Sequence, residues 1–142
     1  MRTSHVRAAD LPERWLLFDA SKEPVGRMAS KIAVHLMGKD LPEYTPSELC
    51  GAHVVVINAE QAVFTGKKEE QKSYPFYSGY PGGLNEIDLP TMRERRPADV
   101  VTLAVRRMLP KNRLGRQMLA RLKVYAGTDH PHGAQKPEKV EA

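Results

Sequence analysis

The sequence predicts a single α/β domain in which helices pack on a small, mainly parallel sheet. Short apolar runs alternate along the chain with segments whose apolar residues recur every three or four positions. A length of 142 residues, of which 41% are apolar, suits one domain with one buried core. No internal repeat interrupts this pattern, and we therefore expect one compact unit with short tails.

The first half of the chain predicts buried strands separated by a helix. The apolar run Trp15 to Phe18 is typical of a strand, and the three-and-four spacing from Pro24 to Leu36 predicts a helix that Gly38 ends. After a proline-containing loop, the β-branched run Val54 to Ile57 is apolar on both faces. Such a strand belongs in the middle of a covered parallel sheet. A further short strand is predicted over residues 62–65.

The second half predicts an irregular aromatic segment followed by two helices. The basic turn 66–68 leads to the segment 73–83, which reads SYPFYSGYPGG. We expect a long surface loop there, because proline and glycine weaken helices and central strands. Helical spacing then predicts a helix over 97–108 and a second over 112–122, with Asn112 as its cap. Residues 124–125 suggest one more short strand.

Positive charge without compensation is the strongest functional signal in the sequence. The chain carries a formal charge of +5, and its pI is near 9.4. From Val100 to Thr128 there is no Asp or Glu, whereas the basic residues are Arg106, Arg107, Lys111, Arg113, Arg116, Arg121 and Lys123. Like charges one helical turn apart repel, and an anionic partner such as nucleic acid would relieve that repulsion. The alternative interpretation is a solvated helix face.

Aromatic residues lie directly beyond a second group of cations. Tyr74, Tyr77 and Tyr80 follow Lys67, Lys68 and Lys72. Flat rings beside cations are typical of surfaces on which exposed bases stack. A loop that folds its rings onto the core is the alternative, and we favour it for Phe76.

The patterns of enzymes and of metal sites are incomplete. A phosphate-binding Walker loop needs Gly five residues before the Gly66-Lys67 pair and Ser or Thr after it, but Gln61 and Lys68 occupy those positions. The carboxylates are scattered, and the histidines at 130 and 132 do not have a familiar zinc spacing. We therefore expect no catalytic residues, no metal, no cofactor and no small-molecule substrate.

The sequence contains no targeting or membrane signal. No apolar run approaches the roughly 20 residues that span a bilayer, and residues 1–14 lack a secretory apolar region. A single cysteine, Cys50, cannot form an internal disulfide. We expect a cytoplasmic protein that does not bind membranes.

Several long motifs resemble one known family. In order, they are WLLFDASKEPVGRMASKIAVHLMGK, VVVINAEQAVFTGKK, SGYPGG, AVRRMLPKNRLGRQMLARLKVYAG and HPHGAQKP. Between about Trp15 and Pro137 the chain resembles the bacterial type of the L-thirteen family of large-subunit ribosomal proteins. The resemblance implies a three-layer α/β/α domain with an about four-stranded, mostly parallel sheet. We expect this domain to span residues 15–127, between an N-terminal extension, 1–14, and an extended C-terminal tail, 128–142.

The resemblance also implies a structural role in the ribosome. We expect the chain to bind large-subunit rRNA of the 23S type, to support early subunit assembly and to contact neighbouring ribosomal proteins. Combined with the cations and rings above, the family's RNA-facing motifs predict an rRNA-binding set: Lys67, Lys68, Lys72, Tyr74, Tyr77, Ser78, Gly79, Tyr80, Arg106, Arg107, Lys111, Asn112, Arg113, Arg116, Arg121, Lys123, His130, His132 and Gln135. Three positions depart from the usual family pattern, and they are Ala52, Tyr77 and Arg107.

Two other functions stay open at this point. A small α/β enzyme that handles nucleotides or phosphoesters would suit the sheet and the Gly66-Lys67 turn, but it lacks a plausible acid–base pair. A regulatory messenger-RNA binder acting outside the ribosome would use the same basic residues.

Overall fold

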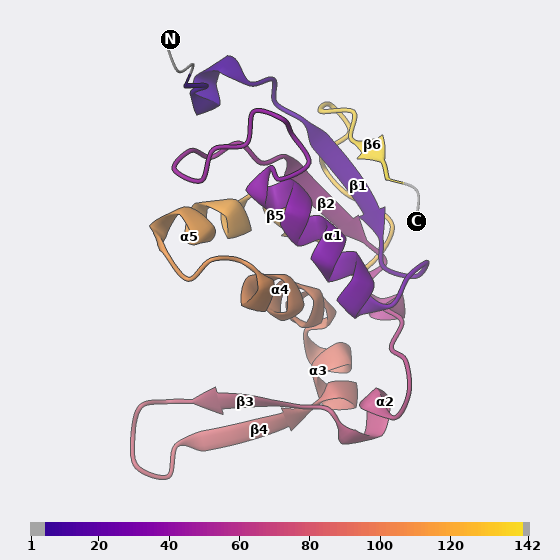
Figure 1. The fold of residues 1–142 in the computed structure, drawn as a ribbon. Helices are drawn as coiled ribbons and strands as arrows, with labels where there is room; N and C mark the ends of the chain where they lie inside the picture. Colours follow the sequence, from indigo (N-terminus) through magenta and orange to yellow (C-terminus); the bar gives the residue numbers. More distant parts are fainter. Residues whose placement is uncertain (1–4, 141–142) are drawn as a thin grey trace.

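Four parallel strands form the centre of the protein (Figure 1). The computed structural model describes residues 5–140, so the first four residues of the expected extension and the last two of the expected tail lie outside it. Strand β1 (Trp15–Asp19) pairs with β2 (His53–Ile57). Strand β5 (Leu122–Val124) lies on the far side of β2, and β6 (Glu138–Lys139) on the far side of β1. The predicted small parallel sheet is confirmed.

Three helices cover one face of this sheet. They are α1 (Val25–Met37), α4 (Pro97–Met108) and α5 (Arg113–Ala120). Because side chains alternate along a strand, Leu16, Phe18, Val54 and Val56 point to the same face, and they share one hydrophobic core with the three helices. Helix α1 ends at Gly38, which adopts the left-handed conformation. The helices predicted from apolar spacing are confirmed.

The C-terminal tail covers the opposite face. Trp15 and His53 lie on that face with their rings stacked, and the ring of His132 lies 5.1 Å from that of Trp15. The hydroxyl of Tyr125 and Nε2 of His132 are hydrogen bonded at 2.8 Å. Val140 N–H then donates to the carbonyl of Leu17 at 3.0 Å. The layer on this side of the sheet is thus the returning tail, which packs on the domain.

The fourth strand is not the one predicted. Residues 62–65 make only an isolated bridge between Val63 and Pro24, because the short 3-10 helix η2 (Ala59–Gln61) turns the chain away from the sheet. The strand expected at 62–65 is therefore wrong, and β6 completes the sheet instead. Strand β6 pairs through its backbone, and both of its side chains are exposed, so it carries no apolar pattern.

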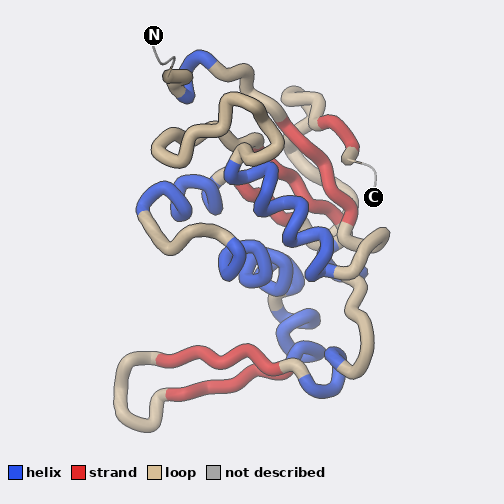
Figure 2. The backbone as a smooth tube through the Cα atoms, in the orientation of Figure 1, coloured by secondary structure: helices blue, strands red, loops and turns tan. Residues whose placement is uncertain are grey.

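The aromatic segment forms most of a β-hairpin and not a long loop. Strands β3 (Ser73–Tyr77) and β4 (Leu84–Asp88) pair antiparallel in a ribbon that projects from the body (Figure 2). The N–H group of Ser78 donates to the carbonyl of Gly83, and that of Leu89 donates to the carbonyl of Lys72. Hydrogen-bonded residue pairs alternate with non-bonded pairs along an antiparallel ladder, so the even-numbered residues of β3 are the hydrogen-bonded ones. Pro75 falls at an odd position opposite Glu86. Its missing N–H removes no bond from the ladder, and for this reason the segment tolerates proline.

Two short helices anchor the hairpin, and neither was predicted from the sequence. They are α2 (Lys68–Gln71) and α3 (Leu89–Arg95). Arg93 on α3 donates to the carbonyls of Glu60 at 2.7 Å and Ala62 at 3.0 Å, and it pairs with Glu69 at 3.3 Å. One side chain therefore ties the base of the hairpin to the segment that leaves the sheet.

At the other end of the chain, a 3-10 helix, η1 (Ala8–Asp10), precedes β1.

Replacing Arg93 should weaken this anchor. Arg93→Met keeps the apolar stem but removes a charged donor from two carbonyls, and we expect the free energy of unfolding to fall by roughly 1 to 2 kcal/mol. Arg95→Met is the matched control, because Arg95 lies exposed on the same helix and forms no ion pair among residues 5–140. Urea denaturation measures both, and an equal loss in the two variants would contradict the anchoring role.

Candidate nucleic-acid interface

Five cations form an exposed surface at the end of α4 and the start of α5. We call Arg106, Arg107, Lys111, Arg113 and Arg116 the basic surface. Within the described part of the chain, none of the five forms an ion pair with a carboxylate. The absence of acidic residues from this stretch of sequence therefore leads to uncompensated charge in space as well. Such a surface is suited to phosphates.

The turn between the two helices is tightly constrained. The side-chain oxygen of Asn112 accepts a hydrogen bond from Gly115 N–H at 2.7 Å, so the predicted cap is confirmed. A Cβ atom at Gly115 would lie 1.9 Å from the carbonyl oxygen of Pro110. Only glycine allows the backbone of the turn to pack this closely on α5. The turn consequently fixes the spacing between the cations on α4 and those on α5.

A groove of about 520 Å³ separates the basic surface from the hairpin. Strand β3 contributes Pro75, Phe76 and Tyr77 to its lining, and the helices and their turn contribute the rest: Leu103, Arg106, Arg107, Leu109, Pro110, Lys111, Asn112, Gly115, Arg116 and Leu119. Two segments that are far apart in sequence therefore line one depression. The sequence did not predict the groove, since its apolar residues follow the same spacing as core residues.

Further cations lie near the base of the hairpin. Lys72 Nζ lies 5.2 Å from the ring centre of Tyr74 and 5.6 Å from that of Phe64. Burial lowers the pKa of Lys72, and the neighbouring charges of Arg107 and Lys68 lower it further. Lys67 and Lys68 are exposed around the start of α2. Lys72 thus lies near the charge of Arg107, whereas Lys67 and Lys68 share the base of the hairpin with the exposed Glu69 and Glu70 of α2.

The aromatic residues of the hairpin divide differently from the prediction. Tyr77 is 67% exposed and Tyr80 75% exposed, and Ser78 and Gly79 lie in the exposed turn between them. Tyr74, however, is only 2% exposed and belongs to a second hydrophobic cluster with Leu89, Met92 and Val100. The expected accessible ring at Tyr74 is wrong, because the base of the hairpin packs on α3 and α4. Phe76, which we expected in the core, is 39% exposed.

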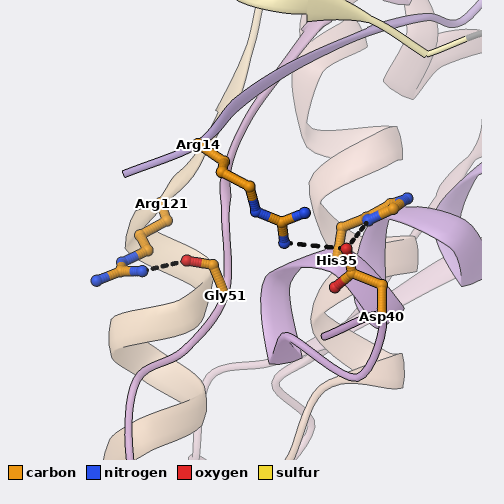
Figure 3. A network of polar contacts seen from close by, with 5 residues as sticks. All are labelled: Arg14, His35, Asp40, Gly51 and Arg121. Atoms are coloured by element: carbon orange, nitrogen blue, oxygen red, sulfur yellow. Dashed lines mark hydrogen bonds and ion pairs between the residues drawn. The ribbon is translucent and has the colours of Figure 1, made fainter. Parts of the chain in front are cut away.

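Arg121 and Lys123 do not join the basic surface. The guanidinium of Arg121 turns inward and donates to the carbonyl of Gly51, as Figure 3 shows. Arg121 follows α5 directly and faces the loop before β2, so its position on an exposed helix face was wrongly expected. Lys123 is exposed on β5, where strand alternation directs it to the face that the tail covers.

A polar cluster beside Arg121 fixes the N-terminal extension. Arg14 donates to Asp40 at 2.9 Å, and Nδ1 of His35 lies 3.1 Å from the same carboxylate (Figure 3). Burial raises the pKa of Asp40, but the hydrogen bonds from Arg14 and His35 outweigh it and the net pKa is lowered. This cluster is structural, because its charges are satisfied by one another.

The candidate residues of the tail lie on the second face of the sheet. His132 is half-buried between Trp15 and Tyr125, and the ring of His130 lies 6.3 Å from that of His132. Gln135 is exposed. Apart from the buried Tyr74 and the inward-turned Arg121, the predicted set falls into two regions, one on the helix side of the sheet and one on the tail side.

Comparison with known proteins identifies the family. The model of the family described as ribosomal protein L13 matches residues 13–131. The chain belongs to the ribosomal protein L13 family. It is 51% identical over 141 residues to the large ribosomal subunit protein uL13 of Aquifex aeolicus, covering 99% of this chain and 98% of that protein. The resemblance inferred from the sequence motifs is confirmed.

Two further L13 relatives agree over nearly the full length. The uL13 protein of Thermotoga petrophila is 50% identical over 140 residues, which is 99% of this chain and 94% of that protein. The protein of the same name from Caldanaerobacter subterraneus subsp. tengcongensis is 50% identical over 141 residues, 99% of each chain. Among residues 5–140 of this L13-family chain, no helix is both long and apolar enough to cross a membrane.

The burial of Tyr74 in this L13-family fold can be tested by removing its hydroxyl group. That hydroxyl is buried and has no hydrogen-bond partner among the described residues, and burial raises its pKa. Tyr74→Phe should therefore leave the free energy of unfolding unchanged or raise it by up to about 1 kcal/mol, because no bond is lost. Urea denaturation beside the exposed control Tyr80→Phe measures the effect. A clear loss of stability in Tyr74→Phe alone would show that the hydroxyl is hydrogen bonded.

Proposed function

We propose that this L13-family chain is a structural component of the large ribosomal subunit and binds large-subunit rRNA through its basic surface and hairpin. The relatives named as large-subunit proteins support the place in the ribosome. The observation that carries rRNA binding is the uncompensated charge of the basic surface beside the exposed aromatic residues of the hairpin. In this proposal, the chain has no catalytic role.

The basic surface supplies affinity, and the fixed spacing of its cations supplies selectivity. Arginine can donate two parallel hydrogen bonds to one phosphate, so Arg113 and Arg116 on one helix face could hold a short stretch of RNA backbone. The turn at Gly115 fixes the relation of those arginines to Arg106 and Arg107. A rigid array of this kind recognises the shape of folded RNA and not its sequence. It would brace rRNA during early subunit assembly.

The hairpin and the tail extend the proposed contact. Tyr77 and Tyr80 offer flat exposed rings on which bases can stack. The tail residues His130, His132 and Gln135, with Lys123, would form a second contact on the other side of the sheet. A chain held in this way would have 23S-type rRNA and neighbouring large-subunit proteins as partners, and it would work in the cytoplasm.

The two alternative functions receive less support. An enzyme that handles phosphoesters needs an acid–base pair, but no Asp, Glu or His among residues 5–140 lines the groove beside the basic surface. A regulatory messenger-RNA binder would use the same cations. Sedimentation of a cell lysate on a sucrose gradient distinguishes a messenger-RNA binder from our proposal. We expect the chain to comigrate with the large subunit.

Binding to purified large-subunit rRNA should depend steeply on salt. If about six to ten phosphates are contacted, raising monovalent salt from about 50 to 200 mM should weaken binding by roughly a thousandfold or more, because counterions are released from the RNA. Filter binding over a salt series measures the slope. A shallow slope would mean that phosphate contacts do not dominate the affinity.

Reversing two charges on α5 should weaken the same complex without unfolding the protein. Arg113→Glu combined with Arg116→Glu changes two exposed side chains, so we expect at least a tenfold weaker complex with rRNA and poor incorporation into subunits. The matched control combines Lys22→Glu with Arg27→Glu, two exposed positions around the start of α1, across the molecule from α5 (Figure 1). Circular dichroism checks the fold, and equal rRNA affinity of the two double variants would remove α5 from the interface.

A further inference from the structure

We propose that the groove between the hairpin and the basic surface receives one unstacked nucleotide of the bound RNA. The base would lie on the apolar lining, and its flanking phosphates would contact the cations at the rim. This inference rests on the proposed function and adds to it a site for a single base.

Part of the groove lining is apolar, and phosphates alone would not cover it. Phe76 from β3, Leu103 from α4 and Leu119 from α5 contribute apolar surface from three separate elements. Phe76 is 39% exposed, although a ring of this size is usually buried. A paired RNA helix would contact only the rim and leave this apolar surface in water. An extruded base has the flat apolar faces that would cover it.

The rim of the groove selects for an anionic occupant. Arg106, Arg107, Lys111 and Arg116 line it, and no carboxylate in the described part of the chain does. Arg107 also lies close enough to Lys72 to lower the pKa of that lysine, which shows that like charges converge at this end. An apolar peptide segment would leave these charges without partners. A nucleotide brings an apolar base and a phosphate in one unit.

The size and the polar groups of the groove fit the same occupant. A volume of about 520 Å³ lies within the range of pockets that hold one small ligand. The side-chain oxygen of Asn112 is occupied by the N–H of Gly115, so the amide NH₂ group is the part of this side chain left to face an occupant. A donor at that position can pair with an acceptor on the edge of a base.

An abasic substitution separates insertion of the base from contact with phosphates. The probes are a single-stranded RNA pentanucleotide and the same pentanucleotide with an abasic central residue, which have the same number of phosphates. At low salt we expect the wild-type chain to bind the intact probe roughly tenfold more tightly, as loss of one base stack predicts. In methyl NMR spectra, the Leu103 and Leu119 signals should shift with the intact probe and much less with the abasic one.

A pair of hairpin variants locates the effect. Phe76→Ala should bind both probes equally, because the wall that contacts the base is gone. Leu84→Ala is the matched control: Leu84 is 57% exposed on the partner strand, does not line the groove, and should retain the tenfold difference. If Phe76→Ala fails to fold, the wild-type NMR comparison still decides.

The outcomes distinguish this inference from the proposed function. Equal binding of intact and abasic probes by the wild type, together with salt-dependent binding of rRNA, would overturn the nucleotide site and leave rRNA binding intact. Failure to bind rRNA at all would overturn both. If the Leu103 and Leu119 methyl signals shift with RNA-free large-subunit proteins and not with the pentanucleotide, the groove binds protein and the inference is wrong.

Discussion

The packing of helix α4 into two hydrophobic clusters is the constraint on which the other parts of the structure depend. Its neighbouring residues Val100 and Val101 point about 100° apart around the helix axis and enter two separate hydrophobic clusters. Val101 and Val105 pack in the main core beneath the sheet, whereas Val100 packs with Tyr74 at the base of the hairpin. One helix therefore fixes the hairpin relative to the sheet. The same helix carries Arg106 and Arg107 in its last turn, so packing of the core also positions the charge.

The charge of this chain is segregated in space and is not simply high. The sequence has 17 acidic residues, but none lies between Val100 and Thr128. Some carboxylates elsewhere are paired with cations, as in Asp40 with Arg14 and Glu23 with Lys31. Exposed pairs of this kind add little to stability, but they neutralise the surface around them. The five cations of the basic surface have no such partner among the described residues, so their fields add beside the hairpin.

The sequence predicted those elements whose burial leaves a periodic pattern. Strand β2 and helices α1 and α4 were predicted because their apolar residues follow the period of the element that buries them. Strand β6 and the hairpin were missed because their side chains are mostly exposed. The cations of α4 and α5 lie off the apolar stripes, and their exposure was therefore predicted correctly. Arg121 and Tyr74 were placed wrongly, because each contacts a segment that is distant in the sequence. Periodicity separates apolar from polar positions but does not report which other element lies opposite a given side chain.

A rigid body with two candidate contact regions suits a bracing role better than either region alone. The basic surface lies on the helix side of the sheet, and the tail residues lie on the other side. The tail is held by the Tyr125–His132 hydrogen bond and by the pairing of β6 with β1, so its orientation is set within the chain itself. RNA segments bound on the two sides would then be separated by the thickness of one folded domain. Little of the binding free energy would be spent on ordering the protein, because both regions are already held by the same sheet.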